Sequence, residues 1–319
     1  MNHLHASKMI LLAAAVLALL CSSRQQRLAQ KSFVRAVLIE ENAAGCSVGL
    51  LYQDVAASAD ASEAGEQLRI VTGQGACLPE AFDAAERRLP EYADYKLCDY
   101  TILCGAWNGG ILRQYQELLL SQSVQGRLSA SLYACGETVD TLADFAEQQD
   151  DFTAEWMDAL VRQKALCPRL YSVSQPAAVL PLLTVEKQMP GRWCDGAVLL
   201  CAETGAQALD ENAAQMLWLL LGRKGQRKFL LDGAQVVLND GRIERTAQTE
   251  GVCVQIWATL NGGGQSLDGT AARLEALAQQ TLAACGEAGR YLLGADAVSA
   301  MAGKPAQAAA VRVEIRLTQ

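Results

Sequence analysis

Two glycine motifs have the residue types and spacing that chemistry at a phosphate or an acyl group would need. Gly73-Gln74-Gly75 stands between an apolar stretch and a helical pattern, where a dinucleotide-binding turn would lie. The full fingerprint requires a third small residue at the position of Leu78, so a tight turn is the favoured interpretation. Gly45-Cys46-Ser47-Val48-Gly49 has the letters of a nucleophile elbow, but a strand is expected after it instead of a helix. Neither motif predicts an active site.

Histidine is confined to the start of the chain, at His3 and His5. The rest of the chain therefore lacks the imidazole that serine–histidine triads, histidine acid–base catalysis and histidine metal sites require. The acidic pairs Glu40-Glu41 and Asp150-Asp151 stand at the ends of expected elements, where solvated ends are favoured over paired-acid hydrolysis. The sequence thus predicts no catalytic, cofactor-binding or metal site, and a histidine-free hydrolase is the enzymatic alternative that stays open.

Cysteine is abundant, but its spacing is not that of a metal or redox motif. The eleven cysteines are Cys21, Cys46, Cys77, Cys98, Cys104, Cys135, Cys167, Cys194, Cys201, Cys253 and Cys285. None forms a C-x-x-C pair, and several lie in apolar runs. The favoured interpretation is a set of small buried hydrophobic residues, with one or two disulfides left open.

The first 21 residues have the pattern of a signal peptide or membrane anchor. A mildly basic start is followed by the apolar run Met9 to Leu20 and then at once by Cys21. A cysteine at that junction predicts lipid attachment at Cys21, although a lipoprotein signal usually has a small residue where Leu20 stands. An uncleaved anchor helix is the alternative. In both cases the rest of the protein is expected to be tethered to a membrane.

Composition predicts a folded, mainly globular chain. Of the 319 residues 51% are hydrophobic and 19% are charged, which suits two or three domains with a sizeable core. The net charge of −8 argues against a nucleic acid partner and against a polybasic membrane patch. Trp156, Trp193, Trp218 and Trp257 stand singly in apolar patterns, which indicates core or interface positions rather than a platform for sugars.

Strand and helix patterns alternate between residues 68 and 134. The expected elements are a strand at 68–72, a helix at 78–89 ended by Pro90, a strand at 95–105, a helix at 111–120 and a strand at 128–134. This alternation predicts an α/β layer in which some strands pair in parallel.

Patterns before and after this stretch add further elements. Strands are expected at 33–39 and 46–52, as a hairpin, and at 196–201. Asp210 is expected to cap a helix that runs through Leu221. Asn239-Asp240-Gly241 predicts a second hairpin turn, between 228–238 and 242–248. A helix capped by Thr270 and a half-buried strand at 311–317 are expected to complete the chain.

The fold class predicted from these patterns is α/β, of mixed α+β character, with several domains. Pro176, Pro181 and Pro190-Gly191 punctuate the middle of the chain and favour a boundary there. The expected division is an anchor at 1–21, an N-terminal α/β domain at 22–190, a middle domain at 191–250 and a reduced helix–strand domain at 251–319.

The order of these elements resembles the Ger(x)C family, the C subunits of bacterial spore germination receptors. The resemblance lies in Val71-Thr72-Gly73-Gln74-Gly75, Pro79-Glu80-Ala81-Phe82, the apolar run Tyr95 to Gly105, the helix Ile111 to Leu120 and the strand Arg127 to Cys135. Cys21 with its polar, arginine-containing lead-out also fits the family layout, as do Gly196 to Leu200 and Glu211 to Arg223. The match covers roughly residues 21 to 260.

This resemblance implies a non-enzymatic lipoprotein subunit of a nutrient germinant receptor, without a cofactor. Its expected partners are two integral membrane subunits, of the A and B types, and membrane lipid. Its expected location is the outer face of the spore inner membrane. The alternative is an exported, membrane-associated binding or scaffold protein that has no role in sporulation.

Overall fold

The computed structural model describes most of the chain from Lys31 onward. The described residues are 31–53, 68–148, 156–158, 160, 161, 164, 166–172, 176–184, 196–201, 205–248, 251–261, 266–303 and 310–318. The predicted anchor at 1–21, including Cys21, lies outside these residues, as do Trp193, Cys194 and the pair Asp150-Asp151.

Within the described residues, a first sheet contains nine strands. They are β1 (Lys31–Asn42), β2 (Gly45–Gln53), β3 (Leu68–Gly75), β4 (Tyr92–Asp94), β5 (Tyr100–Leu103), β6 (Ser131–Cys135), β7 (Ala177–Leu183), β8 (Gly196–Cys201) and β9 (Gly205–Leu209). The order is β3-β2-β1-β5-β6-β7-β8-β9, with β4 paired beside the start of β1. The run β1-β5-β6-β7 is parallel, and both ends of the sheet are antiparallel.

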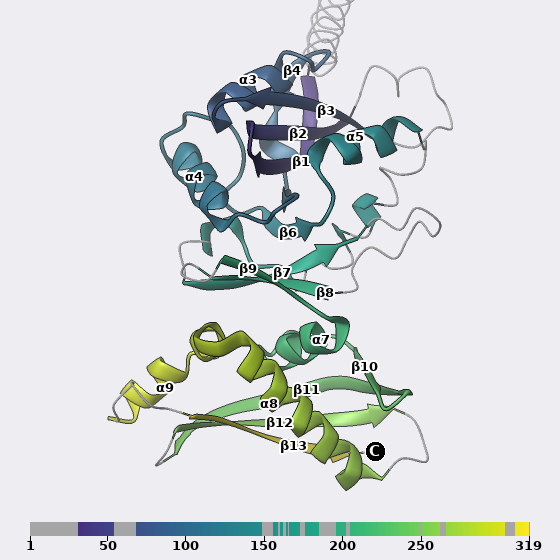
Figure 1. Ribbon diagram of the computed structural model, residues 1–319, viewed down its shortest axis with the longest axis vertical. Coiled ribbons are helices and arrows are strands. Elements are labelled where there is room, and N and C mark those ends of the chain that lie inside the picture. Colours follow the sequence, from purple (N-terminus) through teal and green to yellow (C-terminus); the bar gives the residue numbers. More distant parts are fainter. Residues whose placement is uncertain are drawn as a thin grey trace, which may run out of the picture.

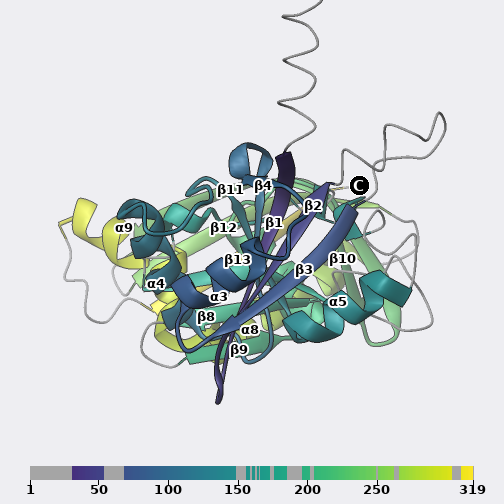
Figure 2. The same cartoon turned by 90° about the horizontal axis from the view of Figure 1, so that it is seen from above.

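The hairpin predicted from residues 33–39 and 46–52 is confirmed as β1 and β2, which pair antiparallel. Figure 2 shows β1, β2 and β3 running side by side when the molecule is seen from above. The strand expected at 95–105 is shorter: residues Tyr95–Leu97 form the 3₁₀ turn η1, and only Tyr100–Leu103 form β5. Asp94 accepts a hydrogen bond from the Lys96 backbone at 3.0 Å, which favours this turn over an extended start.

Helices cover both faces of the first sheet. On one face lie α3 (Leu78–Glu86) and α4 (Gly109–Leu120), and on the other lies α5 (Val139–Gln148). The short turn η2 (Leu170–Ser172) follows later in the chain. Side chains of β1 alternate between these layers: Val37 and Ile39 face α3 and α4, while Leu38 faces α5. Burial on both sides explains why β1 and β6 read as nearly continuous apolar runs.

The second sheet has four strands among the described residues, in the order β10-β11-β12-β13. They are β10 (Arg227–Leu231), β11 (Ala234–Gln248), β12 (Gly251–Asn261) and β13 (Ala310–Thr318), accompanied by the helices α7 (Glu211–Leu220), α8 (Leu267–Leu292) and α9 (Ala295–Met301). The first three strands pair antiparallel and β13 pairs parallel to β12. This arrangement and the first sheet confirm the mixed α/β class.

Helix α7 lies between the two sheets and is apolar on both sides for that reason (Figure 1). Met216 and Leu220 pack with the second sheet, whereas Leu217 and Trp218 pack against β7, β8 and β9 of the first. Asp210 caps the helix as predicted, accepting a hydrogen bond from the Ala213 backbone at 2.8 Å. Cys285 of α8 joins the same contact layer, so both helices bind the sheets together.

The two sheets divide the chain between Leu209 and Arg227, not at the boundaries expected at 190 and 250. Strands β8 and β9 follow the proline-rich segment, yet they pair with β7 and so complete the first sheet. Residues 248 and 251 pair with each other across the β11–β12 ladder, so the expected boundary at 250 falls inside a hairpin. Proline and glycine in a sequence do not distinguish a hairpin from a domain linker, which is why their pattern favoured a boundary here.

Two further sequence predictions were wrong in detail. Asn239-Asp240-Gly241 is no hairpin turn, because β11 continues through it and pairs with β12 on either side of a bulge. The turn lies instead at Asp232-Gly233, where both residues have the positive φ that a type I′ turn requires. Helix α8 begins earlier than expected, with Ser266 as its cap, and Thr270 is buried.

Side chains from the helices cover both edges of the second sheet. Asn212 of α7 both donates to the Leu230 carbonyl and accepts from the Leu230 amide, each at 2.9 Å, as a neighbouring strand would. On the other edge, Glu275 accepts from the Ile315 amide at 2.8 Å and Gln279 donates to the Val311 carbonyl at 3.3 Å. At these positions the backbone groups that would otherwise attract a further strand are occupied.

Candidate interaction face

Gly73 and Gly75 lie inside β3, so the predicted tight turn was wrong. They pair with Val48 and Cys46 of β2 in a regular antiparallel ladder. The glycines are needed because α3 crosses directly over them. A Cβ atom on Gly73 would lie 2.2 Å from the Ala85 backbone nitrogen, and one on Gly75 would lie 2.5 Å from the Glu80 Cβ. Both glycines belong to the strand and not to the two-residue bend Ala76-Cys77 that joins it to the helix, so this motif offers no cradle for a phosphate.

Ser47 is buried in the middle of β2 and is only 2% exposed. Its neighbours on either side continue the strand, so the sharp strand–turn–helix that exposes a nucleophile is absent from this described segment. The rejection of the nucleophile elbow is therefore confirmed.

Glu40 is a structural carboxylate, and the prediction that it is a solvated end was wrong. It is 6% exposed and accepts a hydrogen bond from the Val139 backbone at 2.8 Å, at the start of α5. The carboxylate thus occupies the position at which a helix N-terminus would otherwise attract an anion. Nearby, Trp107 donates to the Cys135 carbonyl at 2.7 Å, and the exposed Glu41 accepts from Asn108. The carboxyl ends of β1, β5 and β6 are therefore closed by the protein's own groups.

We expect Glu40→Ala to lower the free energy of unfolding by about 1–3 kcal/mol, because the buried Val139 amide would lose its acceptor. Glu41→Ala is the matched control, since that neighbouring carboxylate is exposed and its loss should change stability by no more than about 0.5 kcal/mol. Urea unfolding of both variants would measure the difference. Equal effects would show that Glu40 does not cap α5.

The cysteines in the described part of the chain form no disulfide. Most are buried, as the sequence predicted, and burial raises the pKa of Cys98, Cys135 and Cys167 to about 12. Thiols with such pKa values are poor nucleophiles at neutral pH. Across the described ranges, no group of three or more His, Cys, Asp or Glu side chains could hold a metal ion. None of the described helices is long and apolar enough to cross a membrane.

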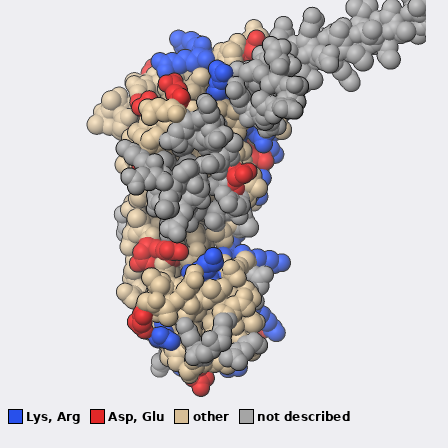
Figure 3. All heavy atoms as spheres, turned by 90° about the vertical axis from the view of Figure 1, so that its right-hand side faces the viewer, with Lys and Arg blue, Asp and Glu red and all other residues tan. Residues whose placement is uncertain are grey.

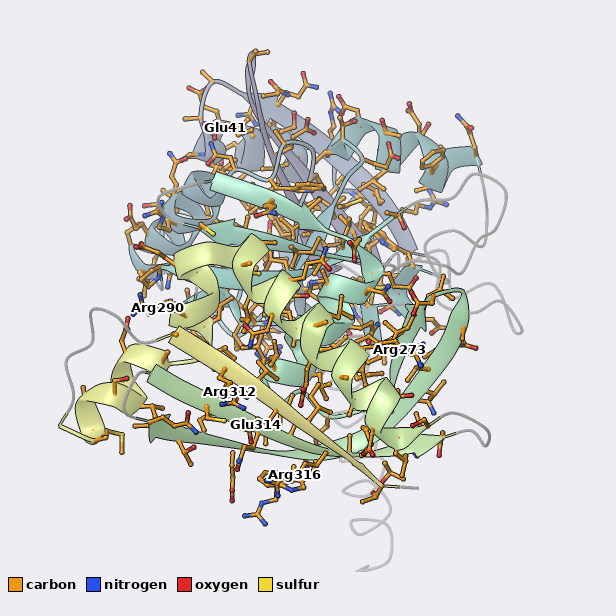
Figure 4. All side chains as sticks on the ribbon, turned by 60° about the horizontal axis from the view of Figure 1, so that its bottom comes forward. Glu41, Arg273, Arg290, Arg312, Glu314 and Arg316 are labelled. Atoms are coloured by element: carbon orange, nitrogen blue, oxygen red, sulfur yellow. The ribbon has the colours of Figure 1, made fainter. Side chains whose placement is uncertain are left out.

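The outer face of the second sheet, on the side away from α8, carries polar and aromatic side chains in regular rows. One row contains Arg242, Trp257 and Arg316, which are paired directly across β11, β12 and β13. The next row contains Glu244, Gln255 and Glu314. We call these six residues together with Arg312 the arginine–tryptophan face. Figure 4 shows Arg312, Glu314 and Arg316 on the side of the sheet opposite to α8.

Trp257 is held between two guanidinium groups. The carbon at the centre of the Arg242 guanidinium lies 5.6 Å from the centre of the tryptophan ring, and that of Arg316 lies 6.0 Å away. Both distances are within the range of cation–π attraction. Fixing the ring in this way lowers the conformational entropy that a partner would otherwise have to remove on binding.

The charges of the arginine–tryptophan face are partly balanced within it. Glu244 pairs with Arg242, and Glu314 lies 3.5 Å from Arg312 while accepting from Gln255 at 3.0 Å. Arg316 is exposed and pairs with no carboxylate in the described part of the chain. Beside this row, burial and then the nearby Glu314 raise the pKa of the Cys253 thiol, which keeps it protonated. Arg316 is therefore the cation of this face that can meet a carboxylate from outside.

The structure shows two different environments for the tryptophans that the sequence assigned to core or interface positions. Trp156 and Trp218 are buried in the core, and Trp193 lies outside the described residues. Trp257 is half-buried on an open sheet face, an interface position of the kind the sequence allowed. The contact of Trp257 with two arginines was not predicted, because it depends on the register of three strands. The alternation of Arg312, Glu314 and Arg316 in the last strand was the available signal.

No family model matches this chain, and no curated protein matches it. The chain is similar to the GerBC protein. Its crystal structure aligns with a TM-score of 0.44 at 12% sequence identity, and the alignment covers 89% of this chain and 97% of GerBC. GerBC is a Ger(x)C protein, the family whose pattern residues 68 to 135 resemble.

Proposed function

We propose that this protein is a non-catalytic, membrane-tethered subunit of a nutrient germinant receptor in spores and that it acts through protein–protein contacts. The resemblance of its sequence to the Ger(x)C family supports the assignment to a germinant receptor. The use of Glu40 as a helix cap and the burial of Ser47 support a non-catalytic role. The main structural support for a role in protein–protein contacts is the open arginine–tryptophan face.

Tryptophan and arginine are the residue types most enriched among those that dominate binding energy at protein interfaces. Here Trp257 lies at the centre of its row, flanked by Arg242 and Arg316. The side chains project from three strands of a packed sheet, so they are positioned before a partner arrives. We therefore assign the partner a surface that presents a carboxylate to Arg316 and covers the indole of Trp257.

The tether belongs to the same proposal. The apolar run Met9 to Leu20, followed by Cys21, supports acylation at Cys21 or an uncleaved anchor helix. The proposed location is the outer face of the spore inner membrane, and the proposed partners are integral membrane subunits of the A and B types together with membrane lipid. An exported binding or scaffold protein without a role in sporulation would use the same face and is the alternative.

The proposal predicts that integral membrane proteins co-purify with the tagged chain from detergent-solubilised spore membranes. Trp257→Ala and Arg316→Glu should each weaken the complex about 30-fold, as expected when a residue that dominates the binding energy is lost. Arg273→Glu is the matched charge reversal, because Arg273 lies on α8, on the covered side of the same sheet (Figure 4). It should leave co-purification unchanged.

Each outcome of this pull-down has a separate meaning. Recovery of the chain alone, or of the same proteins from growing cells, would contradict the receptor and favour the exported scaffold. Recovery of integral membrane proteins by both face variants at the native level would place the contact elsewhere on the molecule. Circular dichroism of each variant would establish that it is folded before the comparison is made.

A further inference from the structure

An open depression of about 840 Å³ lies beside the start of β1, at the opposite end of the molecule from the second sheet (Figure 1). Its walls come from β1, from β4 and η1, and from the segment that follows α4. Three cations line it, Lys31, Lys96 and Arg127, against one carboxylate, Asp94. Lys31 pairs with Asp94 at 2.7 Å, and Arg127 pairs with Asp99 at 2.7 Å. Lys96 is exposed and forms no ion pair within the described residues.

Two large exposed side chains adjoin residues that line this depression. Tyr92 is 83% exposed and Leu97 is 44% exposed, and each directly adjoins a lining residue in the sequence. Tyr92 pairs with Lys31 in the β1–β4 ladder, so ring and cation lie at the same level of the sheet. Tyrosine beside lysine or arginine is typical of the membrane–water interface, where the ring lies among headgroups and the cations meet phosphate.

The depression also lies where the chain enters the body of the protein. Only nine residues, 22–30, separate the predicted anchor at 1–21 from Lys31, which is ten residues beyond Cys21. A fully extended chain of that length spans at most about 36 Å. If Met9 to Leu20 or an acyl group on Cys21 is in the bilayer, this end of the molecule is held within that distance of the headgroups. The inference that follows therefore rests on the proposed tether.

The acidic character of the whole chain does not oppose this orientation. A net charge of −8 predicts repulsion from an anionic surface only for charges that the surface can sense. At physiological salt the field of a surface falls off over about 8 Å, so the residues that touch it decide the energy. Figure 3 shows Lys and Arg atoms at the upper end of the molecule, the end at which β1 begins, with Asp and Glu atoms beside them.

We propose that the end of the protein around β4 and η1 rests on an anionic membrane leaflet. Tyr92 and Leu97 lie among the lipid headgroups in this arrangement, and Lys96, with Lys31 and Arg127, faces their phosphates. The arginine–tryptophan face then points away from the membrane. It meets the part of a partner that stands farthest from the bilayer.

A competition between two vesicle populations tests this orientation with the full chain. Neutral phosphatidylcholine vesicles and vesicles that also contain phosphatidylglycerol are offered together, and they are then separated by density. The total amount of protein bound to vesicles measures the effect of the tether. The distribution of bound protein between the two vesicle populations measures the effect of the cationic depression. We expect a preference for the anionic vesicles that falls about ten-fold in Lys96→Glu and about five-fold in Tyr92→Ser, and that disappears at high salt.

Lys228→Glu is the matched control, because Lys228 is an exposed lysine on the second sheet, at the other end of the molecule. It should keep the native distribution. Equal distribution of the native protein, or equal loss in Lys96→Glu and Lys228→Glu, would overturn the proposed orientation while leaving the tether intact. Failure to associate with either vesicle would overturn both. A preference abolished by soluble glycerol phosphate would assign the depression to a free phosphate ligand instead of a membrane.

Discussion

Replacing Gly73 with alanine is expected to lower the free energy of unfolding by about 3 kcal/mol. The new Cβ atom would lie 2.2 Å from the backbone nitrogen of Ala85 and 2.4 Å from the carbonyl oxygen of Ala81. Both contacts are with the backbone of α3, so no side chain can rotate away and the helix itself must shift. Overpacking of this kind costs about 1–3 kcal/mol and sometimes more, and a rigid neighbour favours the upper end of the range.

Urea unfolding followed by far-ultraviolet circular dichroism would measure this loss. Gly109→Ala is the matched control, because a Cβ at Gly109 meets nothing within 4 Å and the residue begins a helix. That change should be neutral or stabilise by up to about 1 kcal/mol. A Gly73→Ala protein as stable as the control would show that α3 does not rest on β3 at this distance.

Trp218→Ala should have a larger effect, about 3–5 kcal/mol, because it empties the contact layer between the two sheets. Trp218 is 1% exposed and packs with residues of β7, β8 and α8 through its side of α7. The layer is small, so neighbours such as Leu199 and Cys285 cannot refill the space without moving a sheet. Stability measured by urea should fall, and unfolding should separate into two transitions, one for each sheet.

Two variants keep this prediction falsifiable. Trp218→Phe retains an aromatic ring and removes an indole N–H that has no partner among the described residues, so it should cost far less, about 1–2 kcal/mol. Trp257→Ala removes the same side chain from an open face and should change stability by about 1 kcal/mol or less. If Trp218→Ala unfolds in a single transition with a cost like that of Trp257→Ala, α7 does not join the sheets.

Helix positions were predictable because their signals are local. Leu78, Ala81, Phe82 and Ala85 repeat at helical spacing and are all buried in α3. Asp210 was predicted to cap α7 from its type and place, and it does. The spacing of Gly73 and Gly75 is equally visible, yet its cause is not. Here glycine was selected for the distance between strand and helix and not for an unusual φ angle, and sequence gives no measure of that distance.

Two Asp-Gly pairs show where local signals end. Asp232-Gly233 and Asp240-Gly241 have the same letters and similar apolar surroundings. The first forms the hairpin turn between β10 and β11, whereas the second is a bulge within β11. The bulge brings Gly241 so close to β12 that a Cβ there would lie 2.6 Å from the Trp257 carbonyl oxygen. Which pair turns the chain depends on how much of β11 finds a partner in β12, and that is decided by the whole sheet.

The same limit applies to the arginine–tryptophan face. Arg242, Trp257 and Arg316 are far apart in the chain and meet because β11, β12 and β13 align in one register. Parallel pairing of β12 with β13 requires the crossover through α8 and α9, which no local pattern specifies. The type of each residue could be read from the sequence, but their meeting could not.

The helix side chains that bind backbone groups at the edges of the second sheet limit the number of strands that it can hold. With Asn212 on β10 and with Glu275 and Gln279 on β13, the ladder cannot readily be lengthened by a strand from another molecule. A partner would then be recognised by the side chains of the open face. Backbone pairing would be less selective, because any extended peptide can supply it. Such a surface can change its partner by substitution while the sheet beneath it stays the same. It also resists the indiscriminate stacking of strands between neighbouring copies of the chain.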